Sequence, residues 1–157
     1  MRRLIAIALA AVGIATPVAA VDWQYTRWGM SVAELVSASA GSVHEVPPEG
    51  EPAGRAGVKM AVGEYAAGPF RMTARFLFHE GLTGVRLEPK PADCGNLEYW
   101  LIDKYGERQG STGQSRMYIW RLEGENTQVF FSAEGRGAEE RCRLHYSALR
   151  HRANAGL

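Results

Sequence analysis

Residues 70–78 read Phe-Arg-Met-Thr-Ala-Arg-Phe-Leu-Phe, and every second side chain in this stretch is apolar. Successive side chains of a β-strand point to opposite faces, so this alternation predicts a strand with one buried face. Arg71 and Arg75 fall on the opposite, outward face. This stretch is the most regular two-residue period in the chain and sets the expectation of a sheet with one polar face.

Further strands are predicted on both sides of this stretch. Val58, Met60 and Val62 alternate with Lys59 and Ala61 before it. After it, His79-Glu80-Gly81 forms a turn into a strand that contains Val85 and Leu87, and prolines at 89 and 91 end that strand. Three more strands are predicted near residues 116–122, 127–133 and 140–148.

Two helices are predicted. Ser31 and Glu34 form a capping box ahead of a helix that ends near Gly41. Asp93 is the expected N-cap of a second helix, which runs to Tyr105 and ends before Gly106.

These elements predict an α+β fold made of two halves, each a helix followed by three strands. The halves cover residues 22–90 and 91–157, and their six strands form one antiparallel sheet with both helices on one face. The proline- and glycine-rich stretch 47–57 is expected to be a loop, and the tail 150–157 to be frayed. Residues 21–157 are therefore expected to form a single domain.

The first twenty residues have the pattern of a secretory signal peptide. Arg2 and Arg3 precede an apolar run from residue 4 to 14, and Val18 and Ala20 occupy positions −3 and −1 of a cleavage site. The run is shorter than the roughly 20 residues of a membrane span, and no second apolar run approaches that length. We expect cleavage after Ala20 and a periplasmic protein, with secretion as the alternative.

The cysteine content and the net charge narrow the class of protein. Cys94 and Cys142 are the two cysteines of the chain, and both lie on predicted inward faces, so we expect them to form a disulfide. The formal net charge is +1, with 18 Lys+Arg against 17 Asp+Glu. This balance argues against a nucleic-acid-binding protein, which would carry a strongly basic surface.

Known catalytic motifs are not found in the sequence. The chain has no G-x-S-x-G or P-loop pattern, and neither His44-Glu45 nor His79-Glu80 extends to H-E-x-x-H. The four histidines are dispersed and meet no metal-ligand spacing. We therefore expect a protein that is not an enzyme and that has no cofactor or metal.

A basic sheet face is the candidate binding site. The predicted outward positions of the strands include five arginines and a histidine, and on one sheet these side chains would share the face away from the helices. Such a face could bind a carboxylate, a phosphate or an acidic protein surface. The alternative is an ordinary polar surface, partly neutralised by Glu64 and Glu88. The six candidate residues are Arg71, Arg75, Arg86, Arg141, Arg143 and His145.

Two motifs carry a resemblance to known proteins. The first is Trp28-Gly29-Met30-Ser31 with Glu34 and Leu35, and the second is Phe76-x-Phe78-x-x-Gly81-x-x-x-Val85, followed by Lys104-Tyr105-Gly106. Over residues 23–36 and 70–106 the chain resembles the small exported envelope proteins of the SmpA and beta-lactamase-inhibitor-protein-like class. The resemblance implies a helix-plus-antiparallel-sheet unit that binds other proteins. The SmpA proteins are lipid-anchored through a cysteine, and this chain has no cysteine before Cys94.

Two functions follow as hypotheses. The first is a periplasmic protein that acts by binding, with an envelope protein as its partner. The second is a carrier or sensor of a small anionic ligand that uses the arginine-bearing face.

Overall fold

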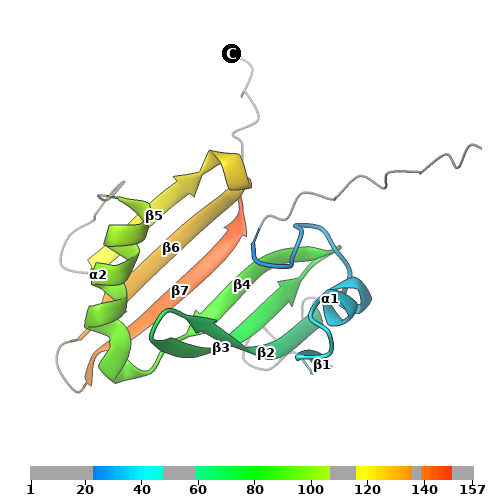
Figure 1. The fold of residues 1–157 in the computed structure, drawn as a ribbon, viewed down its shortest axis with the longest axis horizontal. Helices are drawn as coiled ribbons and strands as arrows, with labels where there is room; N and C mark the ends of the chain where they lie inside the picture. The colour runs from blue at the N-terminus through cyan, green and yellow to red at the C-terminus, as the bar shows by residue number, and fades with distance from the viewer. Residues whose placement is uncertain (1–22, 48–58, 107–115, 136–138, 150–157) are drawn as a thin grey trace, which may run out of the picture.

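The computed structural model describes residues 23–47, 59–106, 116–135 and 139–149. It has an α+β fold in which one antiparallel sheet of seven strands packs against two helices (Figure 1). The helices are α1 (Val32–Ala38) and α2 (Cys94–Tyr105), with short 3-10 turns at Pro91–Asp93 and Glu123–Glu125. The strands are β1 (Val43–Val46), β2 (Lys59–Ala67), β3 (Phe70–Phe78), β4 (Leu82–Glu88), β5 (Arg116–Leu122), β6 (Thr127–Glu134) and β7 (Arg141–Ala148).

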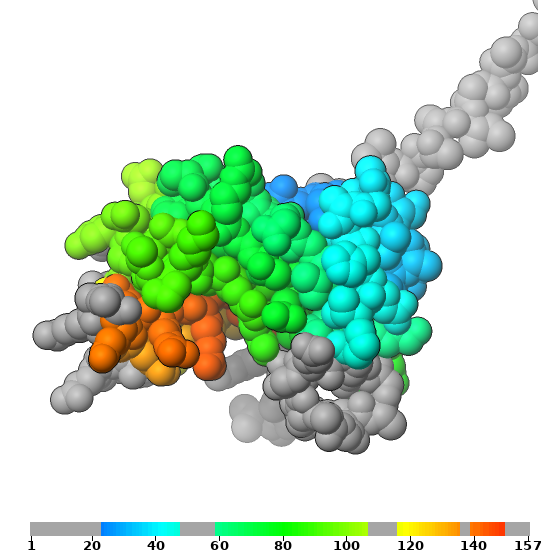
Figure 2. Space-filling view, turned by 90° about the horizontal axis from the view of Figure 1, so that it is seen from below, coloured from blue at the N-terminus to red at the C-terminus, as the bar shows by residue number. Residues whose placement is uncertain are grey.

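The sheet has the strand order β1-β2-β3-β4-β7-β6-β5, and every neighbouring pair is antiparallel. The centre of the sheet is the pairing of β4 with β7, two strands that are far apart in the sequence. In the space-filling view, the cyan residues of α1 and β1 lie at one end of the molecule and the orange residues of β7 lie at the other (Figure 2).

The inner face of the sheet carries the core. The apolar alternation of β3 is buried as predicted, with Phe70, Met72, Ala74, Phe76 and Phe78 all at most 4% exposed. These side chains form one buried cluster with Leu35 of α1 and with Leu97 and Leu101 of α2. Both helices therefore pack on the inner face, and in Figure 1 they lie over different strands, α1 near β1 and β2, α2 over β5, β6 and β7.

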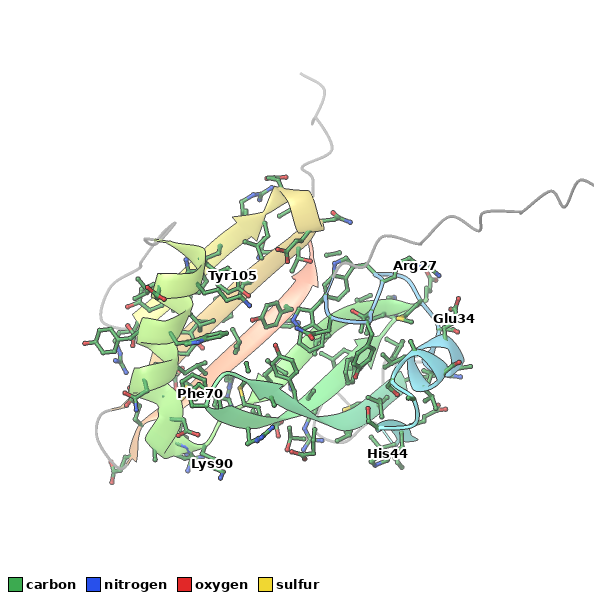
Figure 3. The ribbon with its side chains drawn as sticks, viewed as in Figure 1. Arg27, Glu34, His44, Phe70, Lys90 and Tyr105 are labelled. Atoms are coloured by element: carbon green, nitrogen blue, oxygen red, sulfur yellow. A yellow bond between two sulfur atoms is a disulfide. The ribbon has the colours of Figure 1, made fainter. Side chains whose placement is uncertain are left out.

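The capping box at α1 is confirmed. The backbone N–H of Ser31 donates to Glu34 Oε2 at 2.7 Å, and the backbone N–H of Glu34 donates to Ser31 Oγ at 3.3 Å. The Ser31 hydroxyl also donates to Glu34 Oε2, at 2.8 Å, and the two hydrogen bonds from Ser31 to this carboxylate lower the pKa of Glu34. Arg27 also reaches Glu34, at 3.4 Å, and both side chains are labelled in Figure 3.

Two predicted details of the fold are wrong. The region 22–90 has four strands, because the short strand β1 pairs with β2, so the expectation of three strands in each half fails. The strand predicted at 58–62 extends to Ala67, since β2 pairs with β3 over its whole length. Asp93 is the N-cap of α2 as predicted, but its side chain makes no cap hydrogen bond, because residues 91–93 form a 3-10 turn that leads directly into α2.

The predicted disulfide is present between Cys94 and Cys142, with a Cα–Cα distance of 5.6 Å. It joins the first turn of α2 to the start of β7. Among the described residues, no helix is long and apolar enough to span a bilayer. The predicted signal peptide, most of the 47–57 loop and the 150–157 tail lie outside the described residues.

Candidate functional site

The outer face of the sheet brings together several of the six candidate residues that the apolar alternation predicts to point outward. Across the sheet, Arg75 lies opposite Arg86, and Arg86 lies opposite His145. The same row continues through Phe130 of β6 to Ile119 of β5. Three of the six candidate residues, from three strands, are therefore direct neighbours on this face.

The remaining candidates lie along β3 and β7. Arg143 and Arg141 are exposed and precede His145 at two-residue intervals on the outer face of β7. Arg71 is exposed on the same face at the start of β3, where it pairs with Ala66 of β2. The strands thus present all six residues on one face, but Arg71 is distant from the row that contains Arg86 and His145.

A groove of about 1270 Å³ crosses this face over β4, β7 and β6. Four of the six candidate residues line it, whereas Arg71 and Arg75 do not. It also contains one aromatic side chain, Phe130, and the hydroxyl of Ser132. We call this feature the outer groove. Its charged lining residues are Arg86, Glu88, Glu134, Glu139, Glu140, Arg141 and Arg143, with His145.

Several charges of the outer groove are already matched within the protein. Arg75 Nε donates to Glu88 Oε1 at 2.6 Å, so the proposed neutralisation by Glu88 is present. Glu140 forms an ion pair with Arg116, and Glu134 lies directly opposite Arg141 in the register of β6 and β7. Two of the four carboxylates of the outer groove, Glu88 and Glu140, are thus in ion pairs with arginines.

Arg143 differs from these arginines. It lies opposite Ser132, and no carboxylate among the described residues lies within ion-pair distance of its guanidinium. An exposed guanidinium without such a partner keeps its five N–H donors for solvent or for a ligand. Arg143 is therefore the strongest candidate in the groove for contacting an anionic group.

One end of the outer groove is held by a buried polar cluster. Glu98 of α2 is 8% exposed and accepts hydrogen bonds from Tyr118 Oη and from Arg116 Nη1, the latter at 2.7 Å. Arg116 also contacts Glu140 of the groove. With the disulfide from Cys94 to Cys142, this cluster fixes α2 to the strands that form the groove.

Residues of the groove from β6 were not among the predicted site residues. The two-residue alternation of β6 buries Val129, Phe131 and Ala133. The same alternation places Phe130, Ser132 and Glu134 outward, so it could have predicted these three groove residues. Glu139 and Glu140 lie just before β7, and no sequence pattern indicates that they line the groove.

A second polar cluster lies on the inner face, between α2 and the N-terminal segment. Tyr105 of α2, labelled in Figure 3, has its hydroxyl 3.2 Å from that of Tyr146. Burial raises the pKa of Tyr146 well above its usual range, and the neighbouring Tyr105 raises it further. Trp23 packs on both Tyr65 and Tyr146, with ring centroids 4.9 Å and 5.3 Å apart. This close packing makes the cluster part of the core.

Within the described ranges, no group of three or more His, Cys, Asp or Glu residues has the arrangement of a metal site. Comparisons of the chain with protein families, with curated proteins and with solved structures gave no match. The resemblance to the SmpA and beta-lactamase-inhibitor-protein-like class therefore stays a prediction from the sequence. What the fold and site define is a class by architecture: a helix-backed antiparallel sheet with a polar groove on its open face.

Proposed function

We propose that this chain is an exported binding protein that recognises a protein partner of the cell envelope through the outer groove. The observation that carries this proposal is the composition of the groove. It combines arginine side chains with a half-buried phenylalanine, and arginine and aromatic residues are enriched where protein interfaces form.

The strand topology also supports the outer groove as the binding surface. We propose that residues 22–90 and 91–157 are two halves of related plan, with four and three strands respectively. Their last strands, β4 and β7, pair at the centre of the sheet, and the outer groove lies over this junction. Binding sites occur preferentially where two structural units meet.

The alternative function is a carrier or sensor of a small anion. The outer groove is larger than the 300–1,000 Å³ of most small-molecule sites. Its charged lining has four glutamates against three arginines, so it has no excess of positive charge to hold a multiply charged anion. These two observations favour a protein segment over a free small anion.

Export is supported by the position of the first core residue and by the disulfide. Cleavage after Ala20 would leave two residues ahead of Trp23, which is 6% exposed and contacts Tyr65 and Tyr146. Disulfides such as Cys94–Cys142 persist in oxidising compartments like the periplasm. We propose the periplasm as the location, with secretion as the alternative.

Site-specific cross-linking tests the proposed function. A photo-reactive amino acid at Ser132, inside the outer groove, should give a discrete protein adduct in cells. The same group at Ala33, an exposed position on α1, serves as the control and should not give that adduct. No adduct at Ser132, or the same adduct at both positions, would contradict the proposed function.

A further inference from the structure

The spacing of the groove residues indicates which chemistry a partner presents. Arg143 lies opposite Ser132, and His145, two residues further along β7, lies opposite Phe130. Two residues along a strand span about 7 Å, and neighbouring strands are about 4.8 Å apart. Arg143 on β7 and Phe130 on β6 are therefore two residues apart along the strands and one strand apart across the sheet.

An extended peptide that runs along β7 has the same repeat. Its side chains at positions i and i+2 point to the same side and are about 7 Å apart. A carboxylate at position i can accept a hydrogen bond from the Arg143 guanidinium while an apolar side chain at i+2 covers Phe130. Ser132 can donate its hydroxyl to the same carboxylate, since it lies directly opposite Arg143.

Charge complementarity decides whether the partner's residue at position i is acidic or basic. Glu88 is bonded to Arg75, and Glu140 is bonded to Arg116, so each of these carboxylates has an arginine of its own. Arg143 has no such carboxylate among the described residues. A basic side chain at position i would place a second cation beside Arg143, whereas an acidic one would match it.

We propose that the outer groove reads an extended segment of a partner protein with an acidic residue followed two positions later by an apolar residue. This proposal rests on the proposed function and adds the chemistry of the partner. Arg143 is the residue that selects the acid, and Phe130 is the residue that selects the apolar side chain.

Fluorescence anisotropy with labelled synthetic peptides tests this proposal on the full chain. The probe is an extended Thr-rich peptide with Glu at i and Leu at i+2. Its controls carry Lys in place of Glu, or have Glu and Leu adjacent. We expect the probe to bind at least tenfold more tightly than either control, because both controls lose one of the two contacts.

Variants of the protein locate the contact. Arg143→Gln should weaken probe binding more than tenfold, and Arg143→Lys should retain part of it because the charge stays while the planar fork is lost. Arg71→Gln is the matched control, since Arg71 is an exposed arginine on the same face outside the outer groove, and it should change binding less than twofold. Circular dichroism of each variant checks that the fold is kept.

The failures of this proposal and of the proposed function give different results. Peptide binding that does not depend on the acid and survives Arg143→Gln, but is lost when Ser132→Trp places an indole in the groove, would overturn the selection rule. The proposed function as a binding protein would then still be supported. Probe binding that 1 mM succinate or inorganic phosphate displaces would overturn both, and would favour the small-anion carrier. No peptide binding by a folded protein would also overturn the selection rule, and the Ser132 cross-link then decides the proposed function separately.

Discussion

The absence of a side chain at Gly81 lets the N-terminal segment pack closely against the sheet. A Cβ at Gly81 would lie 2.4 Å from the carbonyl oxygen of Gly29, and its φ of +126° is one that other residues rarely adopt. The backbone of Gly29 and Met30 makes two hydrogen bonds with Leu82 at this place, of 2.9 Å and 2.8 Å. A side chain here would have to displace backbone, which cannot move aside as a flexible side chain can.

We expect Gly81→Ala to lower the free energy of unfolding by about 2–4 kcal/mol. Gly41→Ala is the control, because Gly41 also has a positive φ, +81°, but nothing lies within 4 Å of its added Cβ. That control should cost about 1–2 kcal/mol, the ordinary penalty of the left-handed conformation. Equal losses for the two variants, measured by urea denaturation, would show that the approach to Gly29 has no energetic effect.

Glu98 is the second residue whose role depends on a close contact. Its carboxylate accepts from Tyr118 and Arg116 while 8% exposed, and hydrogen bonds to charged groups contribute about 1.5–3 kcal/mol. Glu98→Ala should therefore lower the free energy of unfolding by about 2–3 kcal/mol. Asp103→Ala, at an exposed position of the same helix, should stay within about 0.5 kcal/mol of wild type. Similar values for both in thermal denaturation would contradict a structural role for Glu98.

At the scale of elements, strand period and helix capping were the reliable signals. The alternation of β3, β4 and β7 assigns the buried and outer faces, including the outward positions of all six candidate residues. The strand β1 was missed because four residues with His44 and Glu45 at their centre have no apolar period to detect. It forms because β2 offers a free edge, and Gly63 lets it approach, since a Cβ there would lie 2.7 Å from Val43.

The pairing of β4 with β7 could not be derived from local sequence. It joins residues such as Arg86 and His145, which are distant in the chain, and it creates the outer groove. The sequence indicates that both strands have a polar face, but which strands are neighbours depends on packing of the whole sheet. The outward positions of the strand residues were therefore predictable, whereas the groove, the place of Glu139 and Glu140 and the ion pair of Glu140 with Arg116 were not.

The disulfide links α2 to β7 and should stabilise both. Cys142→Ser should lower the free energy of unfolding by about 2–5 kcal/mol, the range for small secreted domains. In the wild-type protein, thiol labelling after denaturation without reduction should detect no free thiol. Labelling of both cysteines would contradict the bond in the protein as isolated.

The contact between α2 and β7 through Tyr105 and Tyr146 also predicts a pH dependence. Burial raises the pKa of Tyr146 well above its ordinary value of about 10, so the folded protein holds the phenolic proton when the unfolded chain releases it. The contribution of protonated Tyr146 to the free energy of unfolding is complete below pH 10. It is lost as the pH rises above 10, by up to about 1.4 kcal/mol per pH unit.

Tyr146→Phe should flatten this alkaline dependence, because it removes the ionisable group. Tyr99→Phe should leave it unchanged, since Tyr99 is 76% exposed. Urea denaturation at pH 8 to 11 measures both slopes, and equal slopes for wild type and Tyr146→Phe would contradict the assignment.

At the scale of the whole molecule, the two faces of the sheet differ. The inner face carries both helices and the buried cluster, and the outer face carries the groove over β4, β7 and β6. We propose that the helices make the sheet rigid and that the outer face binds the partner.

The affinity of the cross-linked partner for two tryptophan variants of the protein tests this proposal. Ser132→Trp places an indole inside the outer groove, and Ala33→Trp adds the same side chain to the exposed surface of α1. We expect a loss of more than tenfold in affinity for Ser132→Trp and a change of less than twofold for Ala33→Trp, with both variants folded. An affinity that survives Ser132→Trp and falls with Ala33→Trp would place the binding surface on the helical side and would contradict the proposal.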